Sequence, residues 1–379
     1  MRDVVIVGGG PVGVFLATLL AESGLDIAVW EKRQEEYRSS RAIGIHPPSL
    51  AAFSAVGVTD QILRRAVLIR RGIARTGGRT LGTVSFARVH GDFPFVAALP
   101  QFETQALIER RLEELAPGAI RRGIELTGLD DHEPDRVALR GHDAHGDVFE
   151  VARFVVGVDG ARSVVRHLLG IRARQRVYNA PFVMGDFRDD TDAGDDAVVH
   201  LESDGVVESF PLPDSRRRFV VRTAAPWAHP SARDVADLVK RRTGADVDPA
   251  TNSMISVFTP QRRIAESLVQ GRTSLIGDAA HEISPIGGQG MNLGWLDAAA
   301  LAPLLVAGVR EGRVDTPTFA DFERQRLTAA WGAAKQAEAN MAMGGPIGGL
   351  RKWARDIGFG LVLASPASHV LARSYTMSR

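Results

Sequence analysis

The chain has 379 residues, 45% of them hydrophobic, which is enough for one large core or two modest ones. Its 46 Lys and Arg residues against 45 Asp and Glu give a net charge of +1, so the composition offers no overall attraction to nucleic acid or to an anionic membrane. The absence of cysteine excludes disulfides, thiolate metal sites and a cysteinyl bond to a cofactor, and it fits the cytoplasm, where we expect the protein to be.

The N-terminal segment has the pattern of a strand, a helix and a second strand. The β-branched run Val4–Val7 predicts a strand that is covered on both faces. Pro11–Ser23 predicts a helix that ends at Gly24, and Asp26–Trp30 predicts the second strand. Residues 3–31 are therefore expected to form a β-α-β unit that opens a parallel sheet. Glycines interrupt the apolar run, so a nucleotide-binding turn explains it better than a secretory signal does.

Three of these glycines have the GxGxxG spacing between the first strand and the helix. Gly8 permits a tight turn, Gly10 lets a pyrophosphate approach the backbone, and Gly13 allows the helix to pack closely on the strand. Glu31, at the end of the second strand, is placed to accept a hydrogen bond from a ribose. This arrangement predicts a bound dinucleotide, either FAD or NAD, and the alternative is a glycine turn of purely structural use.

Later segments predict a return to this sheet. Gln101–Leu115 has the apolar spacing of an amphipathic helix. Residues 119–157 predict short strands and turns that end in an apolar strand at 154–156. Thr273–Ile276 predicts a further strand of the first sheet, and Met291–Val309 predicts a long helix that follows a glycine-rich loop.

The pattern changes between residues 176 and 261. Short strands at 198–201, 206–210 and 218–222 are separated by Asp-Gly and Pro-Asp turns, which is typical of an antiparallel sheet. This region is the best candidate for a substrate domain. We interpret Arg216–Arg218, which follows a Pro-Asp-Ser turn, as a solvated face of that turn rather than an anion site.

Two further motifs, a DG pair at Asp159-Gly160 and a GD pair at Gly277-Asp278, specify the cofactor. The first lies in the segment 155–163, and the second is followed by Pro285 and by the glycine-rich residues 287–292. With the N-terminal GxGxxG, their order and separation match those of the group A FAD monooxygenases, which share the para-hydroxybenzoate hydroxylase fold. The chain resembles this family.

The resemblance implies roles for individual residues around FAD. It implies that Asp278 and Gln101 contact the ribityl chain, that Arg41 reaches the pyrophosphate side, that Asp159 supports the cofactor site and the domain contact, and that Pro285 lies beside the flavin ring. Each role is transferred from the matching position of a motif, so each is an expectation.

Physical chemistry supports the GD segment independently of the family. A carboxylate such as that of Asp278 at the end of a buried strand is costly unless hydroxyl groups donate to it, although a helix cap is the alternative. The backbone N–H groups of Met291 and Asn292, after Gly290 at the start of the long helix, form an anion site that favours a reduced flavin. We expect His281 to pack or cap rather than to catalyse, and His46 to be a solvated loop residue rather than a pocket residue.

The predicted architecture is α/β, with a Rossmann-like FAD-binding domain, an inserted antiparallel-sheet substrate domain and C-terminal helices. The FAD-binding domain is expected to comprise residues 1–72, 97–175 and 262–345. The substrate domain is expected to comprise 73–96 and 176–261, and the closing helices 346–379. No other apolar run has the length and lack of charge of a membrane span.

The resemblance implies an FAD-dependent monooxygenase that uses NADPH or NADH as a transient co-substrate and O2. It would hydroxylate an organic substrate, expected to be aromatic, through a C4a-hydroperoxyflavin. The alternatives are a reductase of the geranylgeranyl reductase type and a non-catalytic flavin-binding module. The expected partners are a small-molecule substrate, O2 and NAD(P)H, with no nucleic acid and no membrane, in a monomer or homodimer. The tyrosine set that activates para-hydroxybenzoate has no counterpart among the three tyrosines here, so a benzoate-type substrate is not supported.

Overall fold

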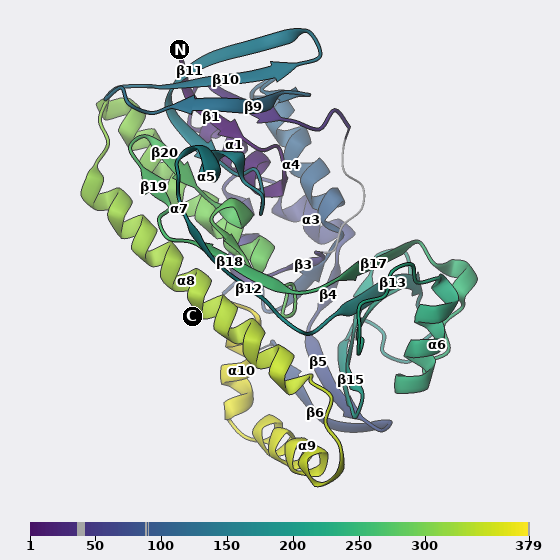
Figure 1. Cartoon of the computed structure of the whole chain (residues 1–379). Helices are drawn as coiled ribbons and strands as arrows, with labels where there is room; N and C mark the ends of the chain where they lie inside the picture. Colours follow the sequence, from purple (N-terminus) through teal and green to yellow (C-terminus); the bar gives the residue numbers. More distant parts are fainter. Residues whose placement is uncertain (36–41, 88, 90, 378–379) are drawn as a thin grey trace.

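The computed structural model describes residues 1–35, 42–87, 89 and 91–377. Figure 1 shows a first sheet with its helices in the upper half and a second sheet with its own helix at the lower right. The long helix α8 (Thr316–Met343) runs along one side of the molecule toward the C-terminal helices. The predicted α/β class, with an inserted sheet and closing helices, is confirmed.

The first sheet is parallel at its centre. Its central strands follow the order β20, β11, β1, β2 and β8, and every neighbouring pair among them is parallel. These strands are β1 (Arg2–Val7), β2 (Ile27–Glu31), β8 (Ile120–Arg122), β11 (Gly146–Gly157) and β20 (Thr273–Leu275). Three antiparallel strands extend it, namely β9 (Glu125–Asp130), β10 (Val137–Asp143) and β19 (Val269–Gln270). The predicted return of the chain at Thr273 is confirmed.

Both faces of this sheet are covered, as the run Val4–Val7 predicts. Val4 and Ile6 belong to a core that the sheet shares with α1 (Pro11–Glu22), α4 (Gln101–Leu115) and α7 (Gly290–Glu311). Val5 and Val7 point the other way, into a core with residues of β9, β10 and α5 (Val164–Leu168). The short helices α2 (Pro47–Ser54) and α3 (Thr59–Arg65) add side chains to the first of these two cores.

Helix α7 is the one helix of the described residues that is long and apolar enough to cross a membrane. Leu301 and Leu305 on this helix are fully buried, and the helix packs against α1 and α8. Its apolar composition is therefore explained by its place in the core.

Two small sheets lie between the larger ones. One contains β3 (Gly44–Ile45), β4 (Val67–Ile69) and β7 (Val96–Ala98), and the other contains β12 (Ala173–Val177), β18 (Gln261–Ala265) and β21 (His281–Glu282). They carry the chain between the first sheet and the second.

The second large sheet has the strand order β17, β13, β16, β15, β14, β5 and β6. Its strands are β5 (Arg71–Thr76), β6 (Arg79–Ser85), β13 (Phe182–Arg188), β14 (Ala197–Glu202), β15 (Gly205–Leu212), β16 (Arg216–Arg222) and β17 (Met254–Phe258). The predicted strands are present and the pairing is antiparallel except between β14 and β5. These two strands lie far apart in the sequence and are not joined by a hairpin turn, so no turn forces the pair to be antiparallel. Helix α6 (Ala232–Thr243) covers one face.

The interpretation of Arg216–Arg218 as a solvated turn is wrong. The turn itself consists of Asp214 and Ser215, both with positive φ, and β16 begins directly after it. Because side chains alternate along a strand, Arg217 and Arg218 enter opposite faces of the sheet, and both are buried. Arg218 pairs with Asp186 of β13, and Arg217 pairs with Asp189 directly after that strand, each at 2.7 Å.

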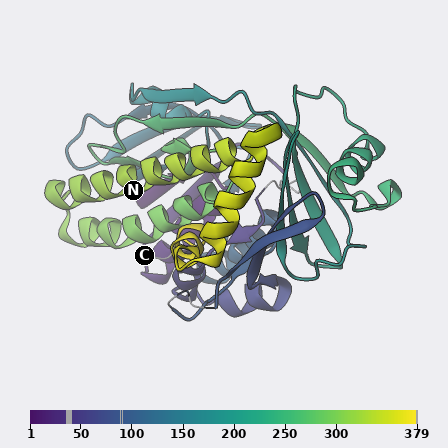
Figure 2. The same cartoon turned by 90° about the horizontal axis from the view of Figure 1, so that it is seen from below.

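The chain closes with α9 (Gly349–Ala364) and α10 (Ala367–Tyr375), as the sequence predicts. Both helices pack on β6, and Figure 2 shows α9 beside the β5–β6 hairpin. Leu363 of α9 and Ala372 of α10 are buried in a core with residues of these strands. The domain boundaries given above stay a prediction.

Candidate functional site

A large cavity of about 940 Å³ joins the first sheet to the second. It lies at the carboxyl ends of β1, β11 and β20, where open α/β sheets bind their ligands. Most of the predicted site residues line it, namely Gly8, Gly10, Glu31, Gln101, Asp159, Asp278, Pro285, Gly290 and Met291. Gly13 and Asn292 do not line it, and Arg41 lies outside the described residues.

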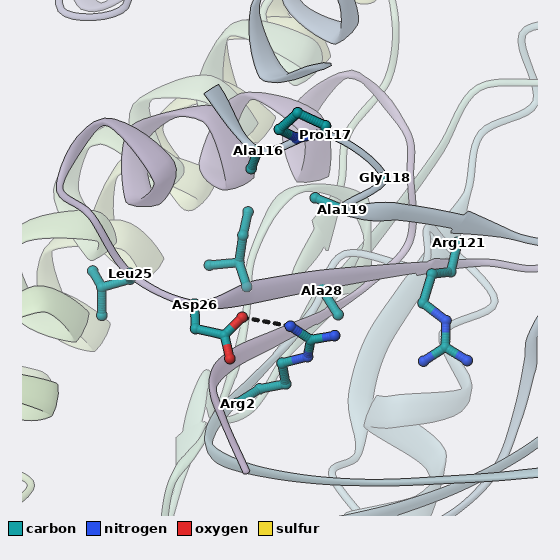
Figure 3. A pocket seen from close by; sticks show the side chains of 10 residues that line it. Arg2, Leu25, Asp26, Ala28, Ala116, Pro117, Gly118, Ala119 and Arg121 are labelled. Atoms are coloured by element: carbon teal, nitrogen blue, oxygen red, sulfur yellow. Dashed lines mark hydrogen bonds and ion pairs between the residues drawn. The ribbon is translucent and has the colours of Figure 1, made fainter. Parts of the chain in front are cut away.

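A second, shallow pocket of about 170 Å³ lies at the amino ends of β1 and β2. Figure 3 shows its main polar feature, an ion pair between Arg2 and Asp26 at 2.5 Å. Of the predicted site residues that the structure describes, none lines this pocket. The large cavity is therefore the candidate site.

The glycine motif has the geometry that its spacing predicts. Gly8 has a φ of +117°, and a Cβ there would lie 2.4 Å from the carbonyl oxygen of Val158. A Cβ at Gly13 would lie 2.0 Å from the carbonyl oxygen of Gly8, so α1 packs directly against the turn. At Gly10, which precedes α1, a Cβ would meet no atom of the described residues within 4 Å. Gly10 therefore leaves open space at the helix N-terminus, where a phosphate is favoured.

Glu31 braces this turn and also faces the cavity. Its Oε2 accepts a hydrogen bond of 2.8 Å from the backbone N–H of Gly9, and its Oε1 accepts two of 2.9 Å from Arg33. Burial acts to raise the pKa of Glu31, but the hydrogen bonds from Arg33 outweigh it, so the pKa lies below its usual value. Its third contact with Arg33, 3.3 Å from Nη2 to Oε2, is the longest.

Asp159 has one oxygen engaged and one free. Its Oδ2 accepts hydrogen bonds from the backbone N–H groups of Val164 and Val165, at 2.6 and 3.1 Å, and so holds the start of α5. Its Oδ1 is buried and has no hydrogen-bond partner among the described residues. A buried acceptor without a donor is costly, so this atom fits a ligand that donates to it.

Asp278 lies in the single turn η2 (Gly277–Ala279) that follows β20. Its side chain caps no helix, and no described residue donates a hydrogen bond to it. The side chain is exposed where it lines the cavity, but the protein around the cavity still limits its hydration. The loss of hydration within the cavity, with the charge of Glu282 adding to it, raises the pKa of Asp278 to about 6. A row of ligand hydroxyls would supply the missing donors.

The N-terminus of α7 faces the same end of the cavity. Gly290 and Met291 line it, and the first N–H groups of a helix have no acceptor within the helix. The side chain of Asn292 is buried and donates to the carbonyls of Gly44 and Gly288, both at 2.9 Å. Asn292 therefore fixes the neighbouring loops, while its backbone N–H belongs to the free helix end.

His46 is placed differently from the expectation. It precedes the two prolines that begin α2, and this position puts it under α7, where its backbone N–H donates to Asn292 at 2.9 Å. The side chain is 4% exposed and lines the cavity, so the interpretation as a solvated loop residue is wrong. Burial lowers the pKa of His46 to about 4, which keeps the ring neutral. His281, in contrast, packs as expected, fully buried beside Asp297.

Sequence reasoning missed the residues of the other end of the cavity. These come from the second sheet, from α8 and from the C-terminal helices, and most are apolar: Met184, Val199, Leu201, Val206, Phe210, Val220, Met343, Phe359 and Leu363. The polar exceptions include Glu208, Asn340 and Tyr375. The strand pattern gave one usable signal, because Glu208 has the same parity as Val206 and Phe210 and so had to share their face.

The donor and acceptor set at the first end fits FAD. Gly10 leaves room for a pyrophosphate, the start of α7 offers N–H groups to an anionic ring edge, and Asp159 and Asp278 offer acceptors without donors. These features lie on elements that share one cavity. The individual contacts stay predictions.

Comparisons with known proteins agree with this geometry. The family described as "FAD binding domain" matches residues 1–337. The chain is 34% identical over 323 residues to a 6-methylpretetramide 4-monooxygenase of Streptomyces rimosus, covering 81% of this chain and 56% of the relative. It is 34% identical over 332 residues to a rifampicin monooxygenase of Streptomyces venezuelae, covering 83% of this chain and 67% of that protein.

A solved structure covers the whole chain. The p-nitrophenol 4-monooxygenase of Pseudomonas putida DLL-E4 is similar with a TM-score of 0.89 and 26% identity, over 100% of this chain and 99% of that one. The chain thus spans little more than half the length of the first curated relative above, but nearly all of this solved structure.

Proposed function

This chain belongs to the FAD-binding-domain family, and from that premise we propose that it is a monooxygenase that uses NAD(P)H and O2 to hydroxylate an aromatic substrate. The relatives named above include monooxygenases of single-ring and of larger compounds, so they support an aromatic substrate without fixing the number of rings. The substrate of this chain is therefore proposed only as a class.

The observation that carries the proposal is the continuity of the cavity. One end has the free acceptors and the helix N-terminus that fit FAD, and the other has apolar walls from a different sheet. Bound FAD would supply the electron transfer and the activation of O2. The chain's own residues hold the cofactor at one end and position an organic ring at the other, and the apolar walls exclude water.

Electrons are proposed to arrive from a nicotinamide that binds only transiently. The sequence has a single GxGxxG motif, at Gly8, Gly10 and Gly13. These 379 residues hold no second turn of that type, and the choice between NADH and NADPH stays open. A cytoplasmic location and a monomeric or homodimeric state are proposed with it.

The experiment that tests this function uses the FAD-loaded protein and labelled oxygen. NAD(P)H oxidation should rise when an accepted aromatic substrate is added, and under 18O2 the product should gain one labelled atom while the other leaves as water. Turnover under strict anaerobiosis would contradict the proposal and favour the reductase of the geranylgeranyl reductase type. Bound FAD with no NAD(P)H oxidation under any condition would favour the non-catalytic flavin-binding module.

A further inference from the structure

The outward face of α9 carries a row of exposed apolar side chains. Spacings of three or four residues put them on one side of the helix, and we call them the apolar ridge: Leu350, Trp353, Ile357 and Leu361. Each is between 43% and 78% exposed. A single exposed apolar residue is ordinary, but a contiguous row marks an interaction surface. Figure 1 shows α9 at the lower end of the molecule, outside both large sheets.

The opposite face of α9 is held by the second sheet and faces the cavity. Phe359 and Leu363, on the side away from the ridge, line the cavity. A Cβ built at Gly82 of β6 would lie 2.6 Å from that of Leu363, so α9 packs directly on the strand. On the same side Asp356 pairs with Lys352 at 2.7 Å. The inner contacts therefore set the orientation of α9 and keep the ridge at the surface.

The elements around the ridge are basic, although the whole chain has a net charge of only +1. The strands β5 and β6 and the helices α9 and α10, of which β6 and α10 pack against α9, together contain seven basic residues and one acidic residue. Four of the seven are paired with carboxylates: Arg71, Arg75, Lys352 and Arg355. The other three are exposed and have no carboxylate partner in the described part of the chain: Arg79, Arg351 and Arg373. The surface beside the ridge therefore carries an excess of positive charge.

An apolar row with cations beside it fits the surface of an anionic bilayer. Helices that lie in the plane of such a surface place Trp and Leu side chains at the acyl boundary and Lys or Arg at the headgroups. With 16 residues, α9 is too short to cross a bilayer, which needs about 20 apolar residues. A second copy of the chain fits the ridge less well, because a twofold contact would bring these three arginines toward those of the other copy.

We propose that α9 docks the protein on an anionic lipid surface, with the apolar ridge at the acyl boundary and Arg79, Arg351 and Arg373 at the phosphates. This departs from the expectation of no membrane partner, because that expectation follows from the net charge of the whole chain and the positive charge here is local. An apolar aromatic substrate dissolved in the lipid would then meet the helix whose inner face lines the cavity. That consequence rests on the proposed function, whereas the docking does not.

Sedimentation of the FAD-loaded protein with lipid vesicles tests the docking without requiring turnover. One set of vesicles contains equal parts of phosphatidylglycerol and phosphatidylcholine, and the other contains phosphatidylcholine alone. The protein should bind the anionic vesicles about a hundredfold more tightly, since three basic residues near an anionic surface contribute about fivefold each. High salt should remove most of this difference.

Substitutions in the ridge assign the binding to α9. Trp353→Ser and Leu361→Ser should each weaken binding to anionic vesicles about tenfold, because each removes an apolar side chain from the lipid. Phe149→Ser is the matched control and should bind like the wild type, since Phe149 is 69% exposed but belongs to β11, which Figure 1 shows at the upper end of the molecule. On binding, the fluorescence emission of Trp353 should shift to shorter wavelength, and Trp353→Phe should lose this shift.

Substitutions of the three arginines measure the contribution of charge. Arg79→Gln, Arg351→Gln and Arg373→Gln should each weaken binding to anionic vesicles about fivefold and leave binding to neutral vesicles unchanged. Arg324→Gln is the control, because it removes the same charge from α8, where Arg324 is exposed and paired with Asp321. Retained FAD absorbance and an unchanged melting temperature show that each variant is folded.

Three results would overturn the docking: no binding of the wild type to anionic vesicles at low salt, equal binding to both kinds of vesicle, or unchanged binding of the ridge variants. A wild-type dimer in sedimentation velocity that Trp353→Ser and Leu361→Ser convert to a monomer would also overturn it, because a second copy would then cover the ridge. The labelled-oxygen experiment is separate. Its failure alone would contradict the proposed function and leave the docking standing.

Discussion

The ring Nε2 of His281 lies 2.6 Å from Oδ2 of Asp297, and both side chains are fully buried. The same carboxylate accepts a 3.1 Å hydrogen bond from the backbone N–H of Gly277 and a 2.5 Å hydrogen bond from Arg326. Asp297 belongs to α7, and Gly277 precedes Asp278. Asp297 therefore ties the turn that carries Asp278 to α7, the helix whose N-terminus faces the cavity.

We expect Asp297→Leu to destabilise the protein by about 3–5 kcal/mol, because it leaves the buried His281 and the partly buried Arg326 without their partner. Denaturant unfolding of the FAD-free protein measures this. Arg324→Ala on the exposed face of α8 is the control, since its ion pair with Asp321 lies at the surface and should contribute less than about 1 kcal/mol. Equal effects of the two substitutions would contradict the structural role of Asp297.

Asp278→Ala should weaken FAD binding more than it weakens the fold. Its carboxyl has no donor within the described residues, so the FAD-free protein loses little, whereas a charge-assisted hydrogen bond is typically worth about 1.5–3 kcal/mol. The expected loss of affinity is roughly ten- to a hundredfold, measured by FAD titration beside melting of the FAD-free form. A strongly destabilised FAD-free form with unchanged affinity would identify Asp278 as a structural residue.

Gly10 and Gly13 offer a matched pair of alanine substitutions. At Gly13 the new Cβ would lie 2.0 Å from a backbone oxygen, so the fold itself should lose about 1–3 kcal/mol or more. At Gly10 the Cβ would meet no atom of the described part of the chain within 4 Å, so the FAD-free protein should keep its stability while FAD binding falls. Unfolding of the FAD-free variants and FAD titration give both quantities. Unchanged FAD affinity in Gly10→Ala would contradict a pyrophosphate at this turn.

Glu208 should make stability depend on pH in a definite direction. Its pKa is raised from 4.5 to about 7, so the folded protein keeps a proton that the unfolded chain has released. Its contribution is therefore fully present below about pH 4.5 and is lost as the pH rises through about 7. Relative to Glu208→Gln, the wild-type free energy of unfolding should fall by up to about 3 kcal/mol across this window. Parallel pH profiles of the two proteins would show that Glu208 does not titrate as described.

The sequence predicted the parts of the site that depend on local chain geometry. Gly8, Gly10 and Gly13 follow one strand, and Asp278 follows another, so the parallel sheet brings them to one edge. The helix at 101–115 is predicted correctly because its apolar spacing is regular. Such features need no knowledge of distant contacts.

The missed features depend on contacts between distant segments. Glu208 and Tyr375 are far apart in the chain, and only the packing of α10 beside the second sheet places both in one cavity. Arg217 and Arg218 resemble a surface turn until their carboxylate partners are known. His46 is polar and follows a loop, and its burial depends on α7, nearly 250 residues later, to which Asn292 ties it.

Part of the cavity wall comes from α9 and α10, which lie beyond the residues that the family matches. Phe359, Leu363 and Tyr375 line the cavity from beyond residue 337, where the family match ends, while the described residues at the end that fits FAD lie within the match. A mutant library confined to these two helices would vary the lining of the substrate end without replacing any described residue that lines the cofactor end. The closing helices are thus the natural starting point for redesigning which compounds the protein accepts.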